Sequence, residues 1–190
     1  PKPAALENGK SYLVKIRTRD QAIPYNERVQ DFTFNYDTLA PVSGIISPAV
    51  TVTHLKTLSL VTGTASDPNL LDGATVQVRL STGTSFPYES DCWTGSGWQT
   101  CAAGQQRLGA RKTGGDTSWT WEFDNLPSTW RNDAVYKIQV WAIDADGREQ
   151  SAGALTVTTF TIDTANTVST VTYPLFGAAF SGLAQLTGTA

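Results

Sequence analysis

The chain has 190 residues and a formal charge of −3, from 14 basic and 17 acidic side chains. This near balance provides no basic field for nucleic acid and no Lys/Arg cluster for an anionic membrane, so we expect neither partner. No apolar run approaches the roughly 20 residues that a membrane-spanning helix needs, and we expect no membrane insertion.

Similar segments recur about 125 residues apart. The matching pairs are YLVKIRTRD at 12–20 with YKIQVWAID at 136–144, FNYDT at 34–38 with FTIDT at 160–164, and LVTGTA at 60–65 with QLTGTA at 185–190. Self-similarity at a fixed period indicates a tandem array of structural repeats. Because the chain has no Met and starts at Pro1, we expect a processed or excised piece of such an array.

The repeats divide the chain into three expected parts. Residues 1–40 are predicted to be the C-terminal part of one unit, 41–164 a complete unit, and 165–190 the N-terminal part of the next. The complete unit is long enough to bury a core of its own. The end pieces are not, so each is expected to need sequence outside this chain or another copy of it.

Alternation of apolar and polar residues predicts half-buried strands. Tyr136, Ile138 and Val140, for example, face one way while Lys137 and Gln139 face the other. In the complete unit we expect strands at 43–47, 56–65, 74–81, 89–94 paired with 97–102, 117–124, 134–143 and 154–163. Seven or more short antiparallel strands in ~120 residues predict an all-β fold, a Greek-key β-sandwich of two sheets.

The segment 82–116 is longer than an ordinary sandwich connection and holds both cysteines in the string CWTGSGWQTC. Folding the string about its central Ser-Gly places Cys92 directly opposite Cys101, close enough for a disulfide. A zinc site needs three or four Cys or His ligands, and His54 is the sole His. A redox pair usually has C-x-x-C spacing, so both alternatives are less favoured than a disulfide. A disulfide-closed hairpin insert therefore indicates an oxidising, extracellular compartment.

Aromatic side chains gather in and near this insert. Tyr88, Trp93 and Trp98 belong to it, and Trp141 lies on the polar face of its strand. Exposed, rigid rings bind sugar faces or partner proteins well, so these four residues are a candidate contact surface. The alternative is that the rings cover the open end of the core, and the sequence does not decide between the two.

Acidic residues stand where loops and linkers are expected. Asp144, Asp146 and Glu149 share a tight turn and form a candidate Ca²⁺ site, because Ca²⁺ prefers hard oxygen ligands. Further Asp and Asn side chains lie in the linkers or share one loop: Asp37, Asp163, Asp67, Asn69 and Asp72. Calcium at such junctions would rigidify the joint between units. The alternative is that these residues simply make Asx turns.

Residues suited to catalysis are scarce. His54 is the only imidazole, and no nucleophile motif such as G-x-S-x-G accompanies it. Two carboxylate pairs are formal candidates for glycoside hydrolysis: Glu89 with Asp91, and Glu122 with Asp124. Solvation explains Glu122, which points outward on its strand, and Asp124, which begins a turn. We therefore expect no enzyme, and no cofactor unless it is calcium.

Several strings resemble a known family. NYDTLAPVSGIISP followed by LSLVTGTASDP, and later AIDADGREQ followed by FTIDT, resemble the bacterial Ig-like and fibronectin-type-III-like repeats of very large secreted or surface proteins. The resemblance covers the whole chain, with departures at Thr167, where the first linker has Pro41, and at Asn26, which lacks the preceding Gly. It implies an Ig-like fold and a role as a stalk, adhesin spacer or fibre subunit.

Two functions follow as expectations. The first is a structural repeat of an extracellular or cell-surface stalk, filament or adhesin, whose partners are other copies and whose assembly could involve strand sharing. The second is a glycan- or protein-binding module that uses the Trp93/Trp98 hairpin, with a polysaccharide or a host-surface protein as its partner.

Overall fold

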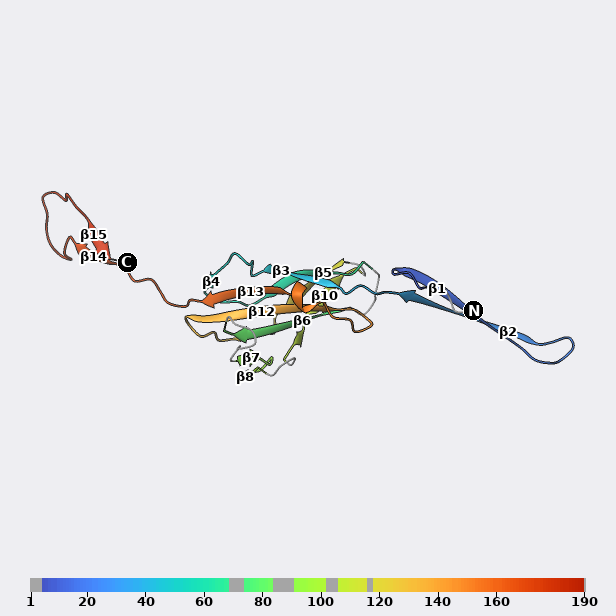
Figure 1. The fold of residues 1–190 in the computed structure, drawn as a ribbon. Coiled ribbons are helices and arrows are strands. Elements are labelled where there is room, and N and C mark those ends of the chain that lie inside the picture. Colours follow the sequence, from blue (N-terminus) through green and yellow to red (C-terminus); the bar gives the residue numbers. More distant parts are fainter. Residues whose placement is uncertain (1–4, 69–73, 84–90, 102–105, 116–117, 190) are drawn as a thin grey trace.

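The computed structural model of the chain describes residues 5–68, 74–83, 91–101, 106–115 and 118–189. These residues form an all-β fold, and the one helical element described among them is a 3₁₀ turn, η1 (Ala152–Ala154). Figure 1 shows an elongated arrangement, with a two-stranded hairpin towards each end of the chain and a two-sheet body between them. No helix in these ranges has the length and apolar character that crossing a membrane requires.

Two sheets form the body. The smaller sheet has the strand order β10 (Arg111–Gly114), β11 (Ser118–Phe123), β5 (Val61–Ser66), β3 (Val42–Ser47). The larger sheet has the order β4 (His54–Leu55), β13 (Thr156–Ile162), β12 (Ala134–Ile143), β6 (Thr75–Thr82), β7 (Asp91–Trp93), β8 (Trp98–Thr100), and β9 (Leu108–Gly109) pairs with β6. The two sheets share one core, which is the layer arrangement of a β-sandwich.

The core faces of β11 and β12 follow the predicted alternation. Trp119, Trp121 and Phe123 of β11 are buried, and so are Ile138 and Val140 of β12. Both sets belong to the same apolar cluster, so the smaller and the larger sheet press their apolar faces together. The hydrophobic effect of this burial is the main stabilising contribution to the body.

The outer face of β12 is buried as well, which the alternation did not predict. Lys137, Gln139 and Trp141 point away from the shared core and still have little exposed surface. Trp141 is covered by Arg107, whose guanidinium carbon lies 4.2 Å from the centroid of the Trp141 ring. One side chain of the insert therefore covers part of the outer face, while its strands β7, β8 and β9 join the larger sheet beside β6.

One predicted strand begins later in the structure than expected. The prediction of a strand at 56–65 is wrong in its first half, because β4 ends at Leu55, paired in parallel with β13 in the larger sheet, and β5 begins only at Val61, between β3 and β11 in the smaller. The residues between β4 and β5 cross from one layer to the other, and one straight strand cannot belong to both. Alternation carries no signal for a change of sheet.

The N-terminal hairpin consists of β1 (Lys10–Arg19) and β2 (Glu27–Tyr36). Tyr12 pairs with Phe34 across it, and their rings stack with centroids 5.6 Å apart. In the body, Tyr136 pairs with Phe160 across β12 and β13, and their rings stack at 5.8 Å. The two hairpins thus hold the same aromatic pair in the same register.

Both hairpins are closed by the same capping contact, which joins an Asn before the first strand to a Thr after the second. Asn8 Oδ1 accepts hydrogen bonds from the Thr38 N–H at 2.6 Å and from the Thr38 hydroxyl at 2.8 Å. Asn132 Oδ1 accepts the corresponding bonds from Thr164, at 2.6 and 2.9 Å. Each amide closes the open end of its hairpin, next to the linker that follows.

The two hairpins differ in how far their apolar faces are buried. Val14, Ile16 and Phe32 on one face of β1 and β2 are 41%, 51% and 60% exposed. Ile138 and Val140, which lie on the corresponding face of β12, are 0% exposed because the smaller sheet covers them. The N-terminal hairpin therefore presents an apolar face that no described part of the chain covers.

The C-terminal hairpin consists of β14 (Thr170–Tyr173) and β15 (Thr187–Thr189). Its register shifts between Val171 and Tyr173, a bulge-type irregularity. The pairing of β3 with β5 shifts in the same way between Ile45 and Ser47. The early strands of the body and the C-terminal hairpin therefore share a local backbone pattern.

A glycine is required at the centre of the T-G-T motif. A Cβ on Gly63 would overlap the carbonyl oxygen of Gly44 in β3 and the indole of Trp121 in β11. A Cβ on Gly188 would lie 2.6 Å from the carbonyl oxygen of Thr170 in β14, a distance that real Cβ atoms do not show. Close backbone approach is a standard reason for glycine inside a strand.

We expect Gly63→Ala to destabilise the body by about 3 kcal/mol, because the methyl group must displace backbone and a packed indole. Urea unfolding followed by Trp fluorescence measures the change. Gly109→Ala is the matched control, since a Cβ on that strand residue meets nothing within 4 Å. Equal stability of the two variants would contradict the close approach.

Candidate functional site

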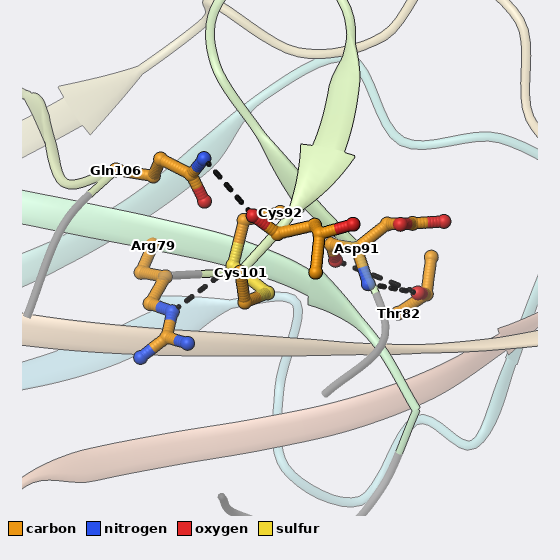
Figure 2. Close-up of a disulfide and its surroundings, with 7 residues drawn as sticks. Arg79, Thr82, Asp91, Cys92, Cys101 and Gln106 are labelled. Carbon is orange, nitrogen blue, oxygen red and sulfur yellow. Dashed lines mark hydrogen bonds between the residues drawn. A yellow bond between two sulfur atoms is a disulfide. The ribbon is translucent and has the colours of Figure 1, made fainter. Parts of the chain in front are cut away.

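A disulfide joins Cys92 to Cys101, with an S–S distance of 2.09 Å and Cα atoms 5.0 Å apart (Figure 2). The predicted register of the hairpin is wrong, however. Cys92 pairs with Gln99, and Trp93 pairs with Trp98, so Cys101 lies diagonally across from its partner. A Cα separation of 5.0 Å is within the range of a disulfide even without direct opposition.

The turn of the hairpin explains the shift in register. The Thr94 N–H donates to the Gly97 carbonyl at 2.9 Å, which centres the turn on Gly95 and Ser96. Gly95 has φ +94°, a conformation that favours glycine. Two-residue hairpin turns often place Gly first, and the prediction had centred the turn one residue later.

Side chains of β6 hold the insert against the larger sheet (Figure 2). The Arg79 Nε–H donates to Cys92 Sγ at 3.2 Å, and Thr82 Oγ1 accepts from the Asp91 N–H at 3.2 Å. Gln106 Nε2 donates to the Thr100 carbonyl at 3.4 Å. The disulfide therefore ties together a hairpin that already rests on β6.

Removal of the disulfide in a Cys92→Ala/Cys101→Ala variant is expected to destabilise the body by about 2–3 kcal/mol, the loop-closure contribution of so short a loop. Urea unfolding measures the difference. Adding a reductant should lower the stability of the wild-type chain to the level of the variant and leave the variant unchanged. Wild-type stability that is insensitive to complete reduction would contradict this.

The structure does not expose the rings of the predicted contact surface as a group. Trp93 is 9% exposed, and its indole N–H donates to the Asn125 carbonyl at 2.8 Å. Trp141 is 6% exposed beneath Arg107. The premise of exposure is wrong for these two residues, and Tyr88 lies outside the described residues. Trp93 instead extends the apolar core at its end.

Among the rings of that set that the structure describes, Trp98 has a partly exposed surface. It packs against Trp93 and against Tyr136, with ring centroids 5.5 and 5.6 Å apart respectively. Beside it lies an open cavity of about 250 Å³, here called the Trp98 cleft. The residues lining the cleft are Thr82, Asp91, Trp98, Thr129, Trp130, Arg131 and Tyr136.

The sequence had not singled out Trp130, which completes the cleft. Its ring meets Tyr136 edge-on at 4.9 Å and Phe160 at 6.0 Å. Trp130 lies in a loop with no alternation around it, so no strand pattern marked its side. The cleft thus combines two indoles with a carboxylate and a guanidinium from Asp91 and Arg131.

The predicted acidic set is also rearranged. Asp146 is exposed, and Glu149 forms an ion pair with Arg107 at 2.9 Å, so neither joins Asp144 in a ligand group. Among the described residues, Asp144 is instead grouped with Asp37 and Asp67, and one carboxylate oxygen of each lies within 4.8 Å of the others. These three residues are here called the junction carboxylates. Each directly follows the last residue of a strand: β2, β5 or β12.

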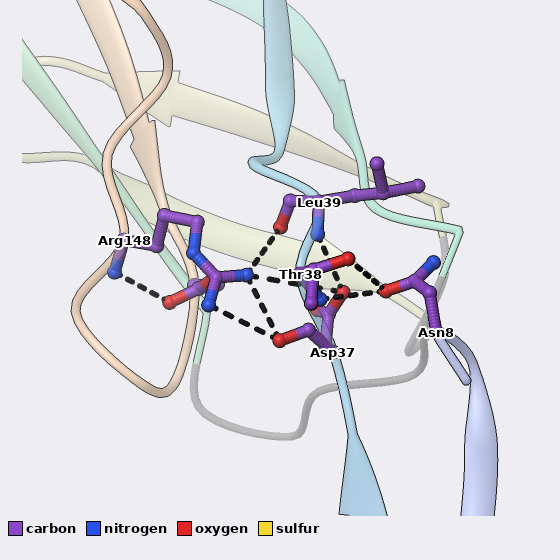
Figure 3. A network of polar contacts seen from close by, with 6 residues as sticks. Asn8, Asp37, Thr38, Leu39 and Arg148 are labelled. Atoms are coloured by element: carbon purple, nitrogen blue, oxygen red, sulfur yellow. Dashed lines mark hydrogen bonds and ion pairs between the residues drawn. The ribbon is translucent and has the colours of Figure 1, made fainter. Parts of the chain in front are cut away.

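Arg148 connects the linker after β2 to the body (Figure 3). Its Nη1 donates to the carbonyl oxygens of Asp37 and Leu39, both at 3.1 Å, and its Nη2 donates to Asp37 O at 3.1 Å. Its own N–H donates to Asp144 Oδ1 at 2.6 Å. Arg148 had not been singled out in the sequence.

The remaining formal candidates for catalysis stay apart. His54 is exposed, and its Nδ1 lies 3.0 Å from the hydroxyl of the adjacent Thr53. Glu122 is paired with Arg111 across β10 and β11. Glu89, the predicted partner of Asp91, lies outside the described residues.

No protein-family model matches the chain, and no curated protein matches it. Among solved structures, one match is Astrotactin-2, a conserved vertebrate-specific and perforin-like membrane protein involved in neuronal development. The sequence identity is 18% over 68% of this chain, and the TM-score is 0.32. This chain spans 22% of the length of that one, and a likeness of this size carries no argument about fold or function.

Proposed function

We propose that the chain is a stretch of a tandem array of Ig-like, Greek-key β-sandwich units that serves as a non-enzymatic stalk, filament or adhesin outside the cell. In this proposal residues 1–40 close one unit, 41–164 form a complete unit with a hairpin insert at 82–116, and 165–190 open the next. An array of this kind provides reach and repeated contact surfaces instead of a reaction centre.

The observation that carries the proposal is the agreement between the two long hairpins. Both place a Tyr opposite a Phe with stacked rings, and both are capped by an Asn that accepts two hydrogen bonds from a Thr. Unrelated hairpins would have no reason to share register, ring geometry and cap. Two copies of one structural unit would share all three.

The C-terminal hairpin also supports the assignment of the chain to repeated units, because it resembles the first strands of the body. Its bulge corresponds to the bulge between β3 and β5, and its Gly188 meets a partner-strand carbonyl as Gly63 does. A unit would therefore begin with a β3–β5-like pair and finish with a β12–β13-like hairpin. The disulfide supports an oxidising compartment outside the cytosol.

Strand sharing between copies is the assembly mode that we propose. In the body, the face of β12 and β13 is covered by the sheet that contains β3 and β5. The N-terminal hairpin has the corresponding face exposed, and the C-terminal hairpin resembles the pair that would cover it. A β14–β15 hairpin from another copy would bury the exposed apolar rings and side chains there.

We expect sedimentation velocity to detect concentration-dependent association of the chain, and Ile16→Asp to weaken it at least about tenfold by placing a charge on the apolar face. Leu13→Asp is the matched control, since Leu13 is equally exposed on the opposite face of β1. A chain that stays monomeric at all concentrations, or equal effects of both variants, would contradict strand sharing between copies.

A second function, the binding of a glycan or a protein segment, is favoured by the Trp98 cleft. Trp98 and Trp130 offer flat apolar surfaces, while Asp91, Arg131 and Thr82 offer hydrogen-bonding groups beside them. Sugar rings have apolar faces and polar edges, which suits such a mixture. The cleft volume of about 250 Å³ fits one or two sugar residues and not a long chain.

Titration of polysaccharides against the chain should change its Trp fluorescence if the cleft binds sugar. Trp98→Ala is expected to reduce the affinity by about tenfold or more, because it removes the exposed stacking surface. Gln99→Ala, the next residue of β8 and an exposed one, serves as the control. A response that is equal in the Trp98→Ala variant would rule out the cleft as the site.

A further inference from the structure

We propose that the junction carboxylates, Asp37, Asp67 and Asp144, bind a Ca²⁺ ion between the N-terminal hairpin and the body. The inference does not depend on the array, because all three residues belong to this one chain. The three residues are 5%, 1% and 4% exposed. They come from three separate parts of the sequence. Burying three carboxylates together is costly unless a cation compensates their charge.

The spacing of the oxygens fits calcium. Two oxygens bound to the same Ca²⁺ lie at most about 5 Å apart, twice the usual Ca–O distance. One oxygen of each junction carboxylate lies within 4.8 Å of the other two. The group contains only carboxylates and neither Cys nor His, which favours a hard cation over zinc.

Asp144 supplies an independent observation, because one of its oxygens is buried without a hydrogen bond. Oδ1 accepts from the Arg148 N–H, whereas Oδ2 is buried and has no hydrogen-bond donor in the described parts of the chain. Arg148 brings one positive charge to the three carboxylates, and its Nη1 lies 4.0 Å from Asp37 Oδ1 and 3.9 Å from Asp144 Oδ2. Both distances are beyond hydrogen-bond range, because the guanidinium is directed to the carbonyls of Asp37 and Leu39. A buried carboxylate oxygen that lacks a hydrogen-bond donor is available to bind a metal ion.

Asp20 shows how the same position is satisfied without an ion. Asp20 follows β1 as Asp144 follows β12, and Asn26 stands where the body has Arg148. The Asn26 side chain donates to Asp20 Oδ2 at 2.5 Å, and this bond lowers the pKa of Asp20 below its usual value. Among the residues that the structure describes, no side-chain amide does this for Asp144, so its second oxygen remains available at the junction.

Calcium at this place would bind the linker to the body. Asp37 belongs to the segment after β2, while Asp67 and Asp144 follow β5 and β12 in the two sheets of the body. One ion would therefore join the linker to both sheets at once. Arg148 already hydrogen-bonds the linker backbone to the body, and the ion would add a second contact through the side chain of Asp37.

Calorimetry on the full chain, first stripped with EDTA, tests the proposal. Titration with CaCl₂ is expected to show about one ion bound per chain. At a free concentration about one hundred times Kd, the Tm of the body is expected to rise by roughly 10 °C, because the ion binds the folded state. Asp144→Asn and Asp37→Asn should each abolish the rise.

Asp146→Asn and Asp163→Asn are the matched controls and should keep the full rise. Asp146 shares the loop of Asp144 but is exposed, and Asp163 accepts from Ala165 N at 2.9 Å as Asp37 accepts from Leu39 N, yet lies outside the group. In EDTA, Asp144→Asn should melt no lower than the wild type, because neutralising one of three crowded carboxylates relieves repulsion. A merely structural role of Asp144 predicts a lower Tm in both conditions.

Three results would overturn the proposal. One is the absence of any Tm rise in the wild type up to about 10 mM Ca²⁺, beyond the weakest range of extracellular calcium modules. Another is a rise that survives in both Asp37→Asn and Asp144→Asn. The third is an equal rise with Mg²⁺ at the same concentrations, which would indicate non-specific screening of acidic groups.

Discussion

Trp121 lies over Gly63 of the neighbouring strand, and this contact anchors the body on which the rest of the chain depends. The indole is fully buried and its N–H donates to the Thr64 carbonyl at 3.1 Å, so the ring is fixed both by packing and by a hydrogen bond. Only a residue without a side chain leaves room for it, which is why the T-G-T motif holds a glycine at that position. The smaller sheet can then press its apolar face on Ile138 and Val140 of the larger sheet.

The linkers on the two sides of the body are built from similar local bonds. Asp37 Oδ1 accepts from Leu39 N, and Asp163 Oδ1 accepts from Ala165 N, each at 2.9 Å. Such Asx turns stiffen the chain over a few residues. In the part of the chain that the structure describes, the first linker has in addition the guanidinium of Arg148, which donates to the Asp37 carbonyl.

Much of the strand arrangement could be predicted from the sequence, because a half-buried strand needs apolar residues at every second position. Tyr136, Ile138 and Val140 met that requirement and lie in the core. The prediction was wrong where the environment did not match the pattern. Arg107 of the insert covers Trp141 on the outer face of its strand, and the residues between Leu55 and Val61 cross from one sheet to the other. Neither event leaves a periodic trace in the sequence.

By itself the sequence determined where most strands run and which cysteines are near enough to pair, since these properties depend on neighbours within a few residues. The tertiary structure alone decided which acidic residues meet. Asp144, Asp146 and Glu149 are close along the chain, but backbone geometry directs them to different surroundings. Asp37 and Asp67 reach Asp144 because the ends of β2, β5 and β12 converge at one end of the body. That convergence follows from strand order in two sheets, which no one-dimensional pattern encodes.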